Sequence, residues 1–118
     1  MPSTWNPVYV HKPLPIFVTI LEDHEKIDQY FKEVIVEHRQ KYPQDIESNV
    51  KAWHSSWTTH HENPKFQPIV DIVVDACRFI SKGYFNCNDI DFHILNLWAM
   101  MYEDTEWTKR HSHFPSDF

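Results

Sequence analysis

Two stretches of the chain repeat apolar residues every three or four positions, a spacing that predicts amphipathic helices. The first runs from His24 to about Tyr42, and Pro43 ends it because proline lacks the N–H that a helix needs. The second starts near Pro68, since proline is tolerated in a first turn. Gly83 follows this pattern, at the position where a left-handed helix cap is expected.

Other stretches are typical of extended structure. A β-branched run at residues 16–21 predicts a strand. Residues 90–102 are apolar on both alternating faces, which predicts a central strand covered on both sides. Residues 107–113 return to extended structure after a polar turn, and residues 43–65 predict a loop with one short strand. The pattern as a whole indicates the α+β class.

Composition narrows the picture further. With 42% hydrophobic and 15% aromatic residues, the chain is expected to fold as a globular domain. The net charge of -6 comes from interspersed acidic and basic residues, which gives no basic patch for nucleic acid. No window approaches the roughly 20 apolar residues that cross a membrane, and no export signal is evident. Cys77 and Cys87 are expected to be free thiols in a reducing cytoplasm.

The chain contains nine histidines, most of which have a structural interpretation. We expect His24 and His38, like His11, to be structural or solvent-facing. His60 and His61 are neighbours in a polar loop, where side chains in extended backbone would point apart and share no metal. His93 is expected to be a hydrogen-bonded core residue.

His111 and His113 differ in their spacing. Two residues apart on a strand, their imidazoles leave the same face and can converge on one iron or zinc ion. Asp117, beyond Pro115, could fold back as a carboxylate ligand. The alternative is that the pair belongs to an exposed hydrophilic tail.

Three segments of the chain, taken in order, follow the pattern of one known enzyme family. The first is residues 53–57 (Trp-His-Ser-Ser-Trp), with the link and helix that follow. The second is residues 96–101, which include a tryptophan, and the third is residues 111–118, which begin with the two spaced histidines. They resemble, in this order, the tryptophan-and-serine segment, the tryptophan-bearing sheet strand and the H-x-H-P-x-S motif of a phage and bacterial group of 2-oxoglutarate- and Fe(II)-dependent oxygenases. The resemblance covers about residues 50–118.

The resemblance implies the N-terminal part of a double-stranded β-helix, a jelly-roll and cupin-like fold, with two helices packed on its larger sheet. It implies Fe(II) as cofactor, 2-oxoglutarate as cosubstrate and dioxygen as oxidant, with His111 as an iron ligand. His113 stands where the family has a carboxylate, so it binds iron itself, or Asp117 supplies the oxygen, or water takes the position. No residue can be assigned as the basic anchor of 2-oxoglutarate, because Arg110 is expected on the strand face opposite His111.

These observations lead us to expect one truncated domain over residues 1–118. Residues 1–50 would supply a strand and a helix, and residues 51–118 a helix, the central strand and the start of the metal motif. The intact protein would be a dioxygenase, a hydroxylase of unknown substrate, in the cytoplasm of a bacterial or virus-infected cell. The fragment would lack turnover and would self-associate through uncovered apolar faces. The alternative function is a small non-enzymatic binding or structural module.

Overall fold

The computed structural model describes residues 6–11, 14–43 and 50–111. In these ranges the helices are α1 (His24–Lys41), α2 (Thr59–Glu62) and α3 (Gln67–Gly83), with a 3-10 turn, η1 (Pro64–Phe66). Antiparallel two-stranded sheets pair β1 (Asn6–His11) with β2 (Leu14–Val18), β3 (Val50–Lys51) with β6 (Trp107–Thr108), and β4 (Trp53–His54) with β5 (Met100–Met101). The α+β class is confirmed, and no sheet within these ranges closes or curls on itself.

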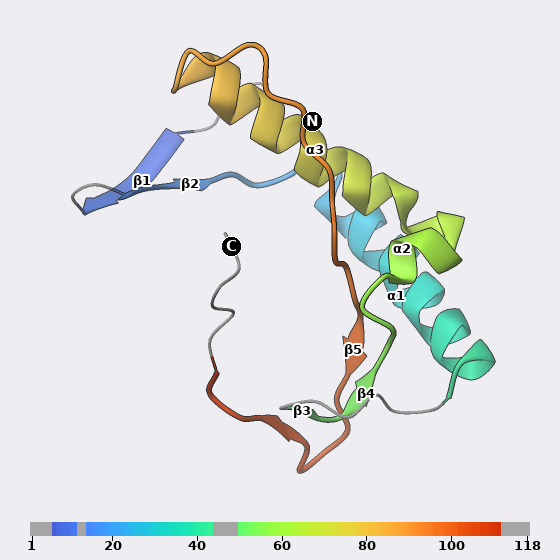
Figure 1. Ribbon diagram of the computed structural model, residues 1–118. Helices are drawn as coiled ribbons and strands as arrows, with labels where there is room; N and C mark the ends of the chain where they lie inside the picture. The colour runs from blue at the N-terminus through green and yellow to red at the C-terminus, as the bar shows by residue number, and fades with distance from the viewer. Residues whose placement is uncertain (1–5, 12–13, 44–49, 112–118) are drawn as a thin grey trace.

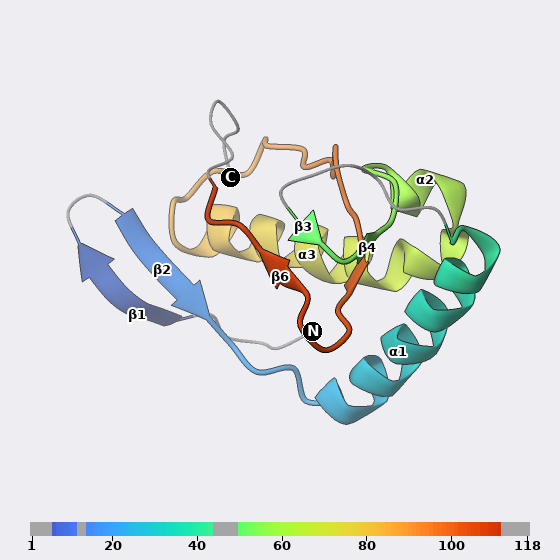
Figure 2. The same ribbon diagram turned by 90° about the horizontal axis from the view of Figure 1, so that it is seen from below.

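Helix α3 occupies the middle of the molecule, between the β1–β2 hairpin and α1 (Figures 1 and 2). Figures 1 and 2 both place the β1–β2 hairpin and α1 at opposite ends of the molecule, with α3 between them. The β4–β5 pair lies beyond α2, below the helices in Figure 1. The buried core lies where α1, η1 and this pair meet, and its members are Val34, Trp53, Phe66 and Ala99.

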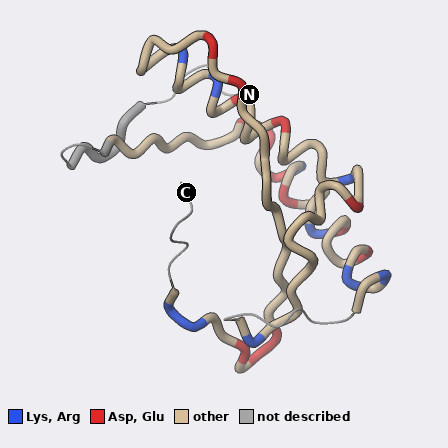
Figure 3. The backbone as a smooth tube through the Cα atoms, in the orientation of Figure 1, with Lys and Arg blue, Asp and Glu red and all other residues tan. Residues whose placement is uncertain are grey.

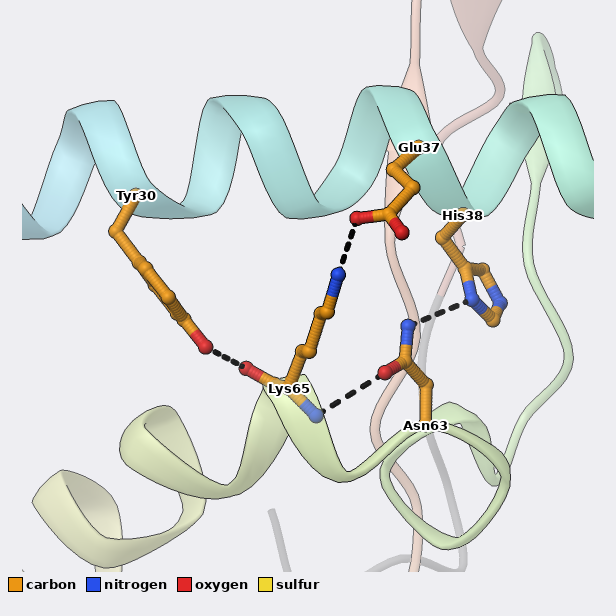
Figure 4. A network of polar contacts seen from close by, with 5 residues as sticks. All are labelled: Tyr30, Glu37, His38, Asn63 and Lys65. Carbon is orange, nitrogen blue, oxygen red and sulfur yellow. Dashed lines mark hydrogen bonds and ion pairs between the residues drawn. The ribbon is translucent and has the colours of Figure 1, made fainter.

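One core position is occupied by a histidine of α1. His38 is 2% exposed, and the rings of Tyr42, Trp53 and Phe66 surround it. The amide Nδ2 of Asn63 donates to Nδ1 of His38 over 3.1 Å, so Nδ1 carries no proton in this arrangement (Figure 4). Burial lowers the pKa of His38, so the ring is neutral in the folded protein near neutral pH.

Beside this histidine, a set of polar contacts joins α1 to η1, and we call it the polar seam; its residues are Tyr30, Glu37, Asn63 and Lys65. The Tyr30 hydroxyl donates to the Lys65 carbonyl oxygen over 2.8 Å, and the Lys65 ammonium lies 2.5 Å from Glu37 (Figure 4). The hydrogen bond and charge of Lys65 lower the pKa of the Glu37 carboxyl. Asn63 caps η1 by accepting from the Lys65 N–H over 3.0 Å. Sequence segments about thirty residues apart are joined here by exposed contacts, which stabilise less than the core does.

The two long helices confirm their prediction, but the extended regions differ from it. The predicted strand at 16–21 is displaced to Leu14–Val18. The predicted central strand at 90–102 is wrong, because only Met100–Met101 is in a strand and Leu95 is 78% exposed. Residues 92–95 line a pocket together with residues of α2 and α3, and Met100–Met101 pair with β4, so the apolar pattern does not belong to a strand covered on both sides.

Two single-residue predictions also fail. Gly83 does not form a left-handed cap: it lies within α3, and no described glycine has a positive φ. The chain leaves the helix at Tyr84 and Phe85, whose N–H groups both donate to the Ile80 carbonyl oxygen. His93 is not a core residue: its side chain is 75% exposed, with Nε2 3.1 Å from Asp91.

Charge is unevenly placed along the described chain. Figure 3 shows acidic and basic residues interspersed on the helices, whereas the segment leading into β5 is free of both. Among the described helices, none has the length and apolar character needed to cross a bilayer. Cys77 and Cys87 are free thiols, as predicted, and burial raises the pKa of Cys77.

Candidate functional site

Two of the segments that carry the family resemblance are paired in space. β4 and β5 are antiparallel, with Trp53 opposite Met101 and His54 opposite Met100 (Figure 1). The pairing continues past the strands, because the Ser55 N–H donates to the Ala99 carbonyl oxygen over 2.9 Å. The tryptophan-and-serine segment and the tryptophan-bearing segment therefore form one structural unit.

Two buried hydroxyl groups, those of Ser55 and Thr59, add hydrogen bonds within this unit. The Ala99 N–H donates to Oγ of Ser55 over 2.8 Å, and the hydroxyls of Ser55 and Thr59 are 2.6 Å apart. Ser55 is 3% exposed and Thr59 is fully buried. Every one of these polar atoms has a partner, so the serine acts as a backbone mimic in the sheet, and its geometry does not suggest a nucleophile.

His54 is a buried residue that the sequence analysis missed. It is 1% exposed, its ring stacks on Trp98 at 5.8 Å, and it lies 4.5 Å from the ring of Trp57. Its Nδ1 lies 2.5 Å from the Ser55 carbonyl oxygen, so Nδ1 is the donor. Trp57 is a local neighbour, but the stacking partner Trp98 lies far away in the sequence, so the stacking could not be predicted.

The β5–β6 connection carries the chain from this unit to the predicted metal motif. Its turn has the Glu106 N–H donating to the Glu103 carbonyl oxygen over 3.1 Å, with Thr105 at φ 73°. The Tyr102 and Thr108 hydroxyls are hydrogen bonded across the turn. An ion pair of 2.8 Å between Arg39 and Glu103 fastens the turn to α1.

His111 lies three residues beyond β6, on an exposed segment without regular structure. Its Nδ1 lies 2.7 Å from the Lys109 carbonyl oxygen, and because a carbonyl only accepts, the proton is on Nδ1. Nε2 then carries the lone pair that a metal requires, and a backbone carbonyl behind the opposite ring nitrogen is the usual support of a metal-bound imidazole.

The remaining predicted ligands cannot be placed beside it. His113 and Asp117 lie outside the described residues. Within residues 6–11, 14–43 and 50–111, no three His, Cys, Asp or Glu side chains are grouped so that they could hold a metal ion. The donor chemistry of His111 fits iron, but one imidazole alone is not a metal site.

The other paired histidines lie elsewhere. His60 and His61 belong to α2 and not to an extended loop, and their ring centroids are 4.0 Å apart. The prediction that extended backbone would separate them is therefore wrong. His60 is held by a hydrogen bond of 2.9 Å to the Ile94 carbonyl oxygen.

Comparison with known proteins found no matching family model, no matching curated protein and no matching solved structure. The family resemblance therefore rests on the residues and contacts described above.

Proposed function

We propose that this chain provides the first part of the iron site of a 2-oxoglutarate- and Fe(II)-dependent dioxygenase, with His111 as one iron ligand. The observation that carries the proposal is the pairing of the resembling segments. β4 lies against β5, and the chain then turns at 103–106 into β6, which leads to His111. Residues that resemble one family in sequence are thus brought into one continuous unit that ends at the predicted ligand.

The tautomer of His111 supports the same proposal. Its Nδ1–H donates to the Lys109 carbonyl oxygen, which orients the ring, and with the proton on Nδ1 an iron ion would be bound through Nε2. His113, or Asp117 in its place, would be the second ligand, and a distal histidine the third. With Asp117 as the second ligand, the set would be two imidazoles and a carboxylate, which suits Fe(II) and leaves open positions.

The double-stranded β-helix is part of this proposal. In it, the β3–β6 and β4–β5 pairs would be the beginning of the two facing sheets, and α1 and α3 would cover the larger one. Antiparallel pairing and the short β5–β6 turn are consistent with a jelly roll. Further strands would pair with the outer edges of these two-stranded sheets.

In the proposed reaction, the bound cofactor and cosubstrate carry out the oxidation, and the protein chain supplies a metal ligand and the surroundings of the site. Bound Fe(II) and 2-oxoglutarate supply oxidative decarboxylation by dioxygen and a strong oxidant for a substrate C–H bond. The chain would contribute the ligand His111 and an uncharged wall, since residues 52–61 and 92–102 contain no Asp, Glu, Lys or Arg. A dry, rigid wall next to an iron site limits side reactions with water.

Metal binding is the first test. Co(II), a paramagnetic substitute for Fe(II), should broaden the imidazole proton signals of His111 at low stoichiometry, and His111→Ala should abolish site-specific broadening. His24→Ala is the matched control, because His24 is also exposed but lies at the start of α1. Equal broadening of His24 and His111 would remove His111 from the proposed site.

Turnover is the second test. Residues 1–118 alone should not release succinate from 2-oxoglutarate with Fe(II) and dioxygen, since neither a third ligand nor a keto-acid anchor is assigned. In a chain that also carries those groups, His111→Ala should reduce succinate release to the background without enzyme, while His24→Ala should not. Turnover that survives His111→Ala would contradict the proposal.

A further inference from the structure

A pocket of about 420 Å³ lies between α2, α3 and residues 92–95, away from the segment that carries His111. One wall is the α3 face that presents Val70 and Val74, and the other is formed by Phe92 and Leu95. Its volume falls within the range of small-molecule sites, which runs from roughly 300 to 1,000 Å³. In Figure 1 the orange segment before β5 passes along α3 and then beside α2.

The polar side of the pocket contains an unused hydrogen-bond acceptor. Nε2 of His60 lies 2.9 Å from the Ile94 carbonyl oxygen, which can only accept, so Nε2 carries the proton. Nδ1 of His60 is therefore a bare acceptor, and it is buried with no hydrogen-bond partner. Buried polar atoms without partners are uncommon in native proteins and call for an explanation such as a ligand. The ring centroid of the exposed His61 lies 4.0 Å from that of His60, and an exposed side chain can change its rotamer.

The charges around the pocket select against anions. None of its lining residues is Asp, Glu, Lys or Arg. Two carboxylates border it through polar lining residues: Asp71 accepts from Gln67 over 2.8 Å, and Asp91 lies 3.1 Å from His93. Arg78, which does not line the pocket, lies 3.5 Å from Asp91, and no Lys or Arg among the lining residues could pair with a ligand carboxylate, so this pocket does not suit 2-oxoglutarate.

We propose that this pocket binds a small uncharged aromatic compound that carries a hydrogen-bond donor, of the phenol or indole class. The ring lies between Val74 and Phe92, where an aromatic face and branched aliphatic groups favour flat apolar molecules. The donor reaches Nδ1 of His60 after His61 turns aside. This inference is independent of the proposed iron chemistry, because it uses no residue of the His111 segment.

The test is a titration of the methyl-labelled full chain followed by NMR. Phenol should cause saturable shifts of the Val70, Val74 and Leu95 methyl signals and leave Val34, in the core, unchanged. Toluene lacks the donor and benzoate adds a negative charge, so each should bind at least about fivefold more weakly, a factor that one net hydrogen bond can give. Shifts that do not saturate, or that reach Val34 equally, would overturn the proposal.

Two variants locate the site. His60→Gln keeps a donor for the Ile94 carbonyl oxygen but places no acceptor where Nδ1 was, so the preference for phenol over toluene should vanish. Val74→Phe fills the pocket and should abolish binding of both compounds. Val73→Phe is its matched control, since Val73 is the adjacent, exposed position of α3 and does not line the pocket. If His60→Gln keeps the full preference, or if the two phenylalanine variants bind alike, the assignment is wrong.

Discussion

The molecule contains two aromatic groups that resemble each other in composition and differ in burial. In the first, Trp53 and Phe66 are each 2% exposed and pack around His38. In the second, Phe17 contacts Tyr84 at 4.8 Å and Phe85 at 6.4 Å, yet Tyr84 and Phe85 remain 49% and 53% exposed. Aromatic content alone therefore does not make a core.

The difference lies in how many segments meet. The first group is enclosed by α1, η1, β4 and the residues before β5, which approach from different directions. Among the described residues, the second lies where β2 meets the two residues that follow α3, and Tyr84 and Phe85 stay half-exposed. Burial, and the stability it brings, should then differ sharply between the two groups.

Truncating one ring in each group gives the largest expected contrast. Phe66→Ala should lower the free energy of unfolding by about 3–5 kcal/mol, because it removes a buried ring and leaves a cavity. Phe85→Ala, at a half-exposed ring, should cost less than about 1 kcal/mol. Urea denaturation followed by circular dichroism measures both. Equal losses would show that the second group is as well packed as the first.

Deleting a buried hydroxyl should have the next largest effect. Ser55→Ala leaves the Ala99 N–H without its acceptor next to the buried aromatic group, and should lower the free energy of unfolding by about 1–3 kcal/mol. Ser56→Ala is the matched control: its hydroxyl donates to the exposed Glu62 over 2.6 Å, and its loss should cost less than about 1 kcal/mol. Similar unfolding midpoints for the two variants would argue against a buried hydroxyl pair.

Lowering the pH should reduce the free energy of unfolding through His38, the histidine at the centre of the first aromatic group. Burial holds the folded-state pKa of His38 below that of the unfolded chain, near 6.5, although the charge of Glu62 opposes the shift and that of Lys41 adds to it. Above pH 6.5 both states are neutral, so this group adds no pH dependence. As the pH falls below 6.5 the unfolded state takes up the proton first, so stability declines until the folded-state pKa is reached.

The slope of that decline is the measurable quantity. From one histidine it is at most about 1.4 kcal/mol per pH unit. His38→Asn, whose side-chain oxygen can still accept from Asn63, should flatten the dependence of the unfolding free energy between pH 6.5 and 5. His24→Ala should leave the slope as it is in the wild-type chain, because His24 is exposed. An unchanged slope in His38→Asn would assign the acid effect to other groups.

The smallest effect is expected at the seam between α1 and η1. Tyr30→Phe removes one hydrogen bond to the Lys65 carbonyl oxygen in a partly exposed setting and should cost less than about 1 kcal/mol. Hydrogen exchange of the amides in α1 should increase only slightly. A loss as large as that of Ser55→Ala would mean that the seam contributes as much as the buried contacts.

The parts of this structure that could be predicted are those set by local periodicity. The helices α1 and α3 follow from the three-and-four spacing of their apolar residues, and Pro43 lies two residues after the end of α1. The segment 90–102 could not be predicted, since apolar residues on both faces suit a central strand and equally a single extended chain that packs between helices and β4. The prediction of a left-handed cap at Gly83 failed because the N–H groups of Tyr84 and Phe85 make the last hydrogen bonds of α3 without a left-handed residue.

The candidate site was predictable only in part. Of the extended segment predicted at 107–113, Trp107–Thr108 is a strand, residues 109–111 have no regular structure, and residues 112–113 lie outside the described residues. The spacing of His111 says nothing of the Lys109 carbonyl that orients its ring. His54 and His60 acquire their environments from Trp98 and Ile94, which reach them only after the chain has folded. Histidines in such positions carry no local signature, because their chemistry is set by residues distant in sequence.

The link between Ser55 and Ala99 bears on how fast the chain folds. These residues are separated by 44 positions, and all of α2, η1 and α3 lies in between. Closing such a loop costs entropy that local contacts do not recover, so α1 and α3 should form early and the β4–β5 junction late. A stopped-flow experiment would then see helical signal in the first phase, with the fluorescence of the tryptophans beside that junction changing only in the last.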